Sequence, residues 1–223
     1  MEKGHPRSSS SPPLYGLDIE TDTAVDGLDP LVGRVLAVAV SAGDGGSGVA
    51  LFDHADEPEL LRQLDRHLAT LSPGVIITWN GARFDLPYLA TRASLTGVEL
   101  GLHLWPDPTC RDGREALPGH TGTSRASWFG HDHLDAYRVY RADVGPALRI
   151  GCSLKTVARL AGLAPVEVDA SRVHDLSAAQ MAAYVGSDAR CTAELARRRW
   201  PTACLSIDRR VAVAEPIPEE TLR

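Results

Sequence analysis

The stretch LYGLDIE, residues 14–20, is a short apolar run that ends in two acidic side chains, Asp18 and Glu20. Apolar runs of this length that contain Tyr and Ile are typical of β-strands. Because successive side chains of a strand point to opposite faces, Asp18 and Glu20 should project from one face and Ile19 into the core on the other. We therefore predict a strand that carries a pair of carboxylates at its end.

Beyond this strand, the sequence alternates between strand and helix patterns. The segment 32–41 is apolar nearly throughout, as expected for a strand that is buried on both faces. A glycine-rich turn and the segment 49–52 then complete a hairpin. Further strands are predicted at 75–79 and, as a strand or short helix, at 133–140. Helices are predicted from 56 to the stop signal at 72–74, and at 84–95, 153–160 and 177–199.

This order of elements is similar to that of ribonuclease-H-like α/β folds, so we expect a mixed five-stranded sheet with helices on both faces. Residues 14–205 are assigned to this one domain, which suits a chain of 223 residues. Residues 1–13 and 206–223 are expected to be tails. Residues 99–130, rich in Gly, Pro, His, Thr and Arg, are expected to form an irregular insertion.

Composition sets few limits on function. The net charge of −6 does not favour a nucleic-acid partner, but acidic side chains that bind divalent cations would be neutralised. No apolar run approaches the ~20 residues of a membrane helix, and the first residues lack the apolar stretch of a signal peptide. The four cysteines are scattered and predict neither a disulfide framework nor a zinc site. We therefore expect a cytoplasmic protein without membrane contact.

Two further motifs place acidic residues where they suit metal binding. Asp85 follows Asn80 and Gly81 at the end of a predicted buried strand, where open α/β sheets bind their ligands. Tyr184 and Asp188 are four residues apart, so both lie on one face of the last predicted helix. Carboxylates that lie side by side repel one another, and a divalent cation between them removes this cost.

The motifs LDIET (17–21), NGARFD (80–85) and YVGSD (184–188), in this order, resemble those of the DEDD superfamily of 3′–5′ exonucleases. A tyrosine four residues before the last aspartate, with Ala rather than His at position 183, is similar to the tyrosine (DEDDy) branch. The resemblance extends over roughly residues 15–199 and is nearest to the exonuclease domain of family B DNA polymerases, to which the segment SLKTVA (153–158) is also similar.

The resemblance implies a site for two Mg²⁺ or Mn²⁺ ions. Asp18 would bridge both ions, and Asp85 would hold the second ion, partly through water. Glu20 and Asp188 would complete the site of the nucleophilic water, which Tyr184 would orient. No strong protein base is then required, since metal coordination lowers the pKa of the attacking water.

By the same resemblance, Thr21, Asn80 and Lys155 are implied as substrate-contacting residues. The implied activity is hydrolysis of single-stranded DNA from its 3′ end, with release of nucleoside 5′-monophosphates and DNA repair as the expected setting. The implied partner is a nucleic-acid 3′ end, and the sequence indicates no protein partner.

Several alternatives stay open at this point. The same chemistry would serve an RNA exonuclease, or endonucleolytic cleavage of structured DNA, and the fold would also serve as a nucleic-acid- or protein-binding module without turnover. His131 and His133, at i and i+2 of a predicted strand and close to Asp135, form an alternative metal site, because two such histidines share a strand face and suit zinc.

Overall fold

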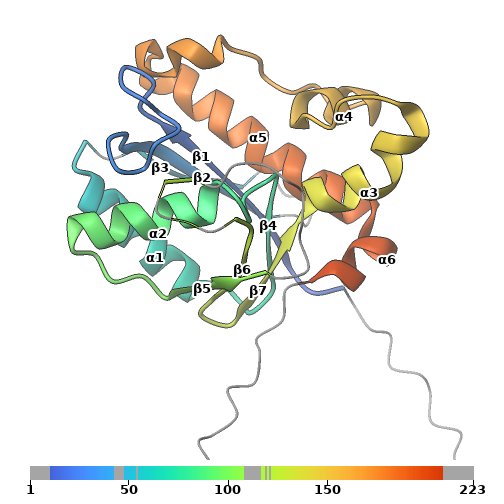
Figure 1. Ribbon diagram of the computed structural model, residues 1–223, viewed down its shortest axis with the longest axis horizontal. Helices are drawn as coiled ribbons and strands as arrows, with labels where there is room; N and C mark the ends of the chain where they lie inside the picture. Colours follow the sequence, from blue (N-terminus) through green and yellow to red (C-terminus); the bar gives the residue numbers. More distant parts are fainter. Residues whose placement is uncertain are drawn as a thin grey trace, which may run out of the picture.

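The computed structural model describes residues 11–42, 48–53, 55–107, 117–118, 120 and 122–207, except for the side chains of Asp143 and Ser206. Most of the two predicted tails, residues 1–10 and 208–223, lie outside the described residues. One sheet with helices packed on its two faces makes up the body of the molecule (Figure 1).

The sheet contains β1 (Leu14–Thr21), β2 (Val35–Ala42), β3 (Val49–Phe52), β4 (Val75–Thr78), β5 (Leu102–Pro106), β6 (Ser124–Trp128) and β7 (His131–Asp135). Within the described residues these seven strands follow the order β3-β2-β1-β4-β7-β6-β5. β1 lies inside the sheet, antiparallel to β2 and parallel to β4. β7 is parallel to β4, whereas the pairs β2–β3, β5–β6 and β6–β7 are antiparallel.

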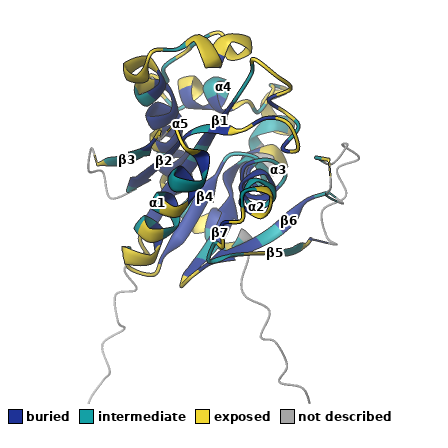
Figure 2. Ribbon diagram, turned by 90° about the vertical axis from the view of Figure 1, so that its left-hand side faces the viewer, coloured by how far each residue is buried: buried dark blue, intermediate teal, exposed yellow. Residues whose placement is uncertain are grey.

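The helices are α1 (Glu57–Thr70), α2 (Asp85–Thr96), α3 (Ala136–Leu148), α4 (Leu154–Leu160), α5 (Ala178–Arg198) and α6 (Trp200–Ala203), with the 3-10 helices η1 (Ala170–Asp175) and η2 (Cys204–Ser206). α1 and α2 cover one face of the sheet, and α5 crosses the other face with α3, α4 and α6 beside it (Figure 1). Figure 2 shows the buried residues gathered in the sheet and on the helix sides that face it. Among the described helices, none has both the length and the apolar character that crossing a bilayer requires.

β1 has a different environment on each face. Leu17 and Ile19 pack in the apolar core beneath α1 and α2. On the opposite face, Gly16 lies directly against α5, and a Cβ atom at this position would be 2.0 Å from the carbonyl oxygen of Ala189. The absence of a side chain therefore lets α5 approach β1 closely, on the face from which Asp18 and Glu20 project.

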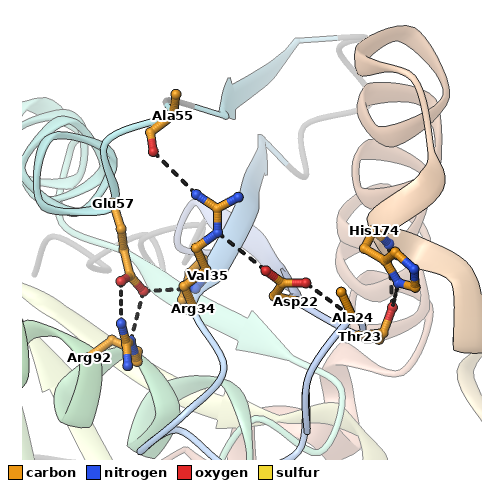
Figure 3. Close-up of polar contacts among 9 residues, drawn as sticks. All are labelled: Asp22, Thr23, Ala24, Arg34, Val35, Ala55, Glu57, Arg92 and His174. Atoms are coloured by element: carbon orange, nitrogen blue, oxygen red, sulfur yellow. Dashed lines mark hydrogen bonds and ion pairs between the residues drawn. The ribbon is translucent and has the colours of Figure 1, made fainter.

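A buried ion pair joins α1, α2 and the start of β2 (Figure 3). Arg92 binds Glu57 through two contacts, Nε to Oε1 at 2.9 Å and Nη2 to Oε2 at 2.5 Å. The same Oε1 atom accepts a hydrogen bond from the backbone N–H of Val35 at 2.7 Å, and Arg92 Nη1 donates to the carbonyl of Pro30. Because a bidentate Arg–carboxylate pair fixes direction as well as distance, this contact fixes the end of the β1–β2 loop on the two helices.

The predicted fold class is confirmed as a mixed α/β sheet with helices on both faces, but the predicted number of five strands is wrong. β5 and β6 lie within 99–130, which the sequence indicated as irregular. β5 is a partly exposed edge strand that ends in Pro106, and β6 (SRASW) lacks a run of apolar residues. The segment 133–140 divides between β7 and α3, which continues to Leu148 through Pro146.

Substitution Gly16→Ala should lower the free energy of unfolding by about 1–3 kcal/mol, the usual cost of an overpacked contact. The added methyl group meets backbone atoms of α5, which cannot move as a flexible side chain would. Urea denaturation measures the effect. Gly48→Ala is the control, since a Cβ atom there meets nothing within 4 Å; equal stability of the two variants would contradict the close α5–β1 contact.

Candidate active site

Three carboxylates from two elements meet at the β1–α5 contact. Asp18 and Glu20 come from β1 and Asp188 from α5, and one ligand oxygen of each lies within 4.8 Å of the others. The i, i+2 spacing on the strand and the close approach of the helix at Gly16 produce this grouping. The structure thus brings together three of the four predicted metal ligands, which we call the acidic group.

The acidic group is costly to keep ionised. Burial raises the pKa of Asp18 well above its usual value, and the charges of Glu20, Asp85 and Asp188 raise it further. Burial, followed by the charge of Asp188, raises the pKa of Glu20 to about 8. These shifts have the direction expected where like charges share a partly dehydrated site. Oxygen ligands of this kind suit hard divalent cations such as Mg²⁺ and Mn²⁺, so the donor set fits the implied metal ions.

Asp85 stands at the first residue of α2 and is buried. It lies outside the group of three, yet its charge contributes to the raised pKa values of Asp18 and Glu20. Burial raises the pKa of Asp85 itself to about 7, opposed by hydrogen bonds from its own backbone N–H and from that of Ile19. The contact with Ile19, which stands between the two acids of β1, ties the second motif to the first.

Asp135, at the end of β7, holds the loop that carries the second motif. Its Oδ1 atom accepts from the backbone N–H of Asn80 at 2.9 Å, and its Oδ2 atom from that of Ala82 at 3.3 Å. It also caps α3 by accepting from the N–H of Tyr137. This positioning role was missed, although an acid between a strand and a helix is the sequence signal of such a cap.

Asn80 adopts a left-handed backbone conformation with φ of 70°. Its buried side-chain oxygen has no hydrogen-bond partner within the described residues. A positive φ is uncommon outside glycine, and such strain often marks functional loops. The predicted substrate contact of Asn80 stays a prediction, and the free acceptor is suited to a donor from a ligand.

Tyr184 and Lys155 lie beside Asp188. The ammonium group of Lys155, on α4, donates a hydrogen bond to Asp188 and lies 4.4 Å from the centre of the Tyr184 ring. Ser153 caps α4 by accepting from the N–H of Thr156. Burial and the charges of Glu20, Asp188 and Asp18 raise the pKa of Tyr184, which keeps its hydroxyl protonated.

Thr21 and the two histidines of β7 have structural contacts. The Thr21 hydroxyl is buried and donates to the carbonyl of Gly27 at 2.7 Å, so its substrate contact stays a prediction. His131 uses both ring nitrogens, accepting from the N–H of Gly74 and contacting the carbonyl of Leu68. His133 Nε2 bonds the hydroxyl of Thr78 at 2.9 Å. These buried contacts argue against the alternative zinc site.

Substitutions Asp18→Asn and Asp135→Asn should change stability in opposite directions. In EDTA at alkaline pH, Asp18→Asn should raise the free energy of unfolding by about 1 kcal/mol or more, because it removes one of several like charges held together. Asp135→Asn should lower it by about 1–3 kcal/mol, because one backbone donor loses its acceptor. Denaturant unfolding measures both, and destabilisation of equal size would contradict the repulsion within the acidic group.

Comparison with known proteins supports the resemblance to polymerase exonuclease domains that the three sequence motifs indicate. Residues 40–157 match the family described as DNA polymerase family B, exonuclease domain. A DNA polymerase of Pyrococcus glycovorans is 35% identical over 91 residues, which cover 40% of this chain and 11% of the polymerase. The catalytic subunit of DNA polymerase epsilon from Schizosaccharomyces pombe is 31% identical over 122 residues, or 53% of this chain and 5% of that protein. The chain thus matches only a small part of these relatives.

A solved structure of the family B DNA polymerase from the archaeon Pyrobaculum calidifontis superposes with a TM-score of 0.67 and 26% identity. The superposition covers 90% of this chain and 26% of the polymerase. It confirms the ribonuclease-H-like fold class. With more than half of the sequence matched, the chain belongs to the exonuclease domain family of the family B DNA polymerases.

Proposed function

We propose that the chain is a two-metal-ion-dependent 3′–5′ exonuclease that hydrolyses single-stranded DNA and releases nucleoside 5′-monophosphates. The observation that carries the proposal is the acidic group on a domain of the exonuclease family, with Asp85 close enough to act on it electrostatically. Family membership supports a divalent-metal-dependent hydrolase. The number of ions, the polarity and the single-stranded substrate are part of the proposal.

The proposed metal ligands are Asp18, Glu20, Asp85 and Asp188. When bound, two divalent ions supply a nucleophilic water and stabilise the charge on the attacking and leaving oxygens. Asp18 belongs to the acidic group and its pKa is also raised by the charge of Asp85, which supports Asp18 as the residue that would serve both ions. Glu20 and Asp188, which lie next to Asp18 in the acidic group, would hold the ion that supplies the nucleophilic water.

Tyr184 is proposed to orient the attacking water. Its raised pKa keeps the phenol neutral, so the hydroxyl both donates and accepts a hydrogen bond. Its ring is fixed by burial and by the ammonium group of Lys155. Lys155 partly neutralises Asp188, and we propose that it also contacts a substrate phosphate.

The proposal predicts that a 5′-labelled single-stranded DNA oligonucleotide is shortened stepwise from its 3′ end with Mg²⁺ or Mn²⁺ and remains intact in EDTA. Asp188→Asn should lower the rate by about 10²-fold or more, the scale of losing one electrostatic contact to the transition state. Glu99→Gln, which changes an exposed acid, should retain wild-type activity. Cleavage that persists in EDTA would contradict the metal requirement.

A matched RNA oligonucleotide tests the main alternative. Faster degradation of RNA than of DNA would make the chain an RNA exonuclease, because only the 2′-hydroxyl distinguishes the two substrates at a given site. Binding of both oligonucleotides without turnover would favour the binding module. Internal cleavage products would indicate an endonuclease.

Substitution Tyr184→Phe separates water orientation from metal binding. It removes only the hydroxyl, so kcat should fall by roughly 10- to 10²-fold with little change in KM, as expected for a contact made in the transition state. The affinity for Mn²⁺, measured by calorimetry, should not change. A large rise in KM at constant kcat would instead assign Tyr184 to substrate binding.

A further inference from the structure

Trp79 stands between two parts of the site that are far apart in the chain. It follows the last residue of β4 and precedes Asn80, the first residue of the second motif. The backbone on both sides of it is held by Asp135, which pairs with Thr78 in the sheet and accepts a hydrogen bond from the N–H of Asn80. The indole group therefore projects from a fixed point of the chain.

The indole N–H of this tryptophan reaches the start of α4. Its Nε1 atom donates a hydrogen bond to the carbonyl of Cys152 at 3.1 Å. Cys152 immediately precedes Ser153, the N-cap of α4, and Lys155 follows two residues after the cap. The ammonium group of Lys155 contacts both Asp188 and the ring of Tyr184. A single hydrogen bond thus links the residue before the second motif to the segment that carries the cation of the third.

α4 needs support from outside its own sequence. It has seven residues, and helices shorter than about 12–15 residues are marginal by themselves in water. Leu154, Val157 and Ala158 pack in an apolar cluster with Leu195 of α5. Apolar packing is non-directional, so it holds the helix against α5 without fixing where the first turn begins. The hydrogen bond from Trp79 is directional, and it acts on the residue before the cap.

The Trp79 ring also packs against α3. Its centre lies 6.2 Å from that of Tyr137 and 5.5 Å from that of Tyr140. The Tyr140 hydroxyl donates to the carbonyl of Leu195 on α5 at 3.1 Å. Phenylalanine at either position would keep a ring and lose the donor. The two aromatic residues therefore allow a matched comparison, since each donates one hydrogen bond to a backbone carbonyl and only one of these carbonyls lies at the start of α4.

We propose that Trp79 is a positioning residue that fixes the start of α4 and thereby holds Lys155 against Asp188 and the substrate phosphate. The inference rests on the proposed exonuclease function and adds to it a mechanical link between the second and third motifs. A tryptophan that served packing alone would contribute to stability without acting through Lys155.

The test compares Trp79→Phe with Tyr140→Phe. In Trp79→Phe, kcat/KM for the single-stranded oligonucleotide with Mg²⁺ should fall by roughly fivefold, the scale of one lost hydrogen bond, whereas Tyr140→Phe should match the wild type. In a Lys155→Met background, Trp79→Phe should cause no further loss, because the residue through which it acts has been removed. Thermal melting verifies that all variants fold. Unchanged kcat/KM in Trp79→Phe, an equal loss in Tyr140→Phe, or a loss that persists in Lys155→Met would overturn the proposal.

Hydrogen exchange provides a readout that does not depend on cleavage. The N–H of Val157 bonds the carbonyl of Ser153 in the first turn of α4, and its exchange reports local opening of that turn. It should be roughly fivefold faster in Trp79→Phe than in the wild type and in Tyr140→Phe. Equal exchange rates in all three would refute the anchoring of α4. If the wild type cleaves no oligonucleotide, the proposed function fails, and the exchange rates still decide whether Trp79 anchors the helix.

Discussion

The repulsion among carboxylates at the β1–α5 contact is the constraint on which the rest of this structure depends. Gly16 lets α5 lie against β1, and this approach sets Asp188 next to Asp18 and Glu20. The pKa values of all three are raised, with burial as the largest cause. Such a grouping lowers the stability of the metal-free protein. The same geometry offers hard oxygen ligands to a divalent cation. A bound cation would remove the repulsion, so the grouping that destabilises the metal-free protein also favours metal binding.

Contacts around the site resist this repulsion. Asp135 holds the backbone of the second motif, and the hydrogen bond from Ile19 places Asp85 next to the first. The bidentate pair of Glu57 and Arg92 fixes the chain that returns from β1 to β2. Lys155 offsets part of the negative charge at Asp188. A site of this kind needs rigid support, because small displacements of the ligands weaken both metal binding and catalysis.

Much of the site could be predicted from local spacing. Asp18 and Glu20 share a strand face at i and i+2, and Tyr184 and Asp188 share a helix face at i and i+4, so the backbone geometry alone places each pair. The sequence also predicted where α4 and α5 begin, and Ser153 and Ser177 cap these two helices in the structure. Each of these features is determined by residues a few positions apart in the chain, which is why the sequence alone was sufficient to predict it.

The features that were missed depend on distant contacts. Asp135 holds a loop 55 residues away, and nothing near it in sequence indicates that partner. β5 is a short, partly exposed edge strand and β6 lacks a run of apolar residues, so both depend on their mutual backbone pairing, and Gly145 and Pro146 obscure α3. The roles of the individual site residues stay predictions.

The most direct test of the account is a calorimetric titration of the chain with Mn²⁺. The account predicts about two ions per chain, with both losing affinity in Asp18→Asn, because we propose that this carboxylate serves both ions. No saturable binding in the wild type, or unchanged binding in Asp18→Asn, would contradict the claim that the acidic group is a metal site.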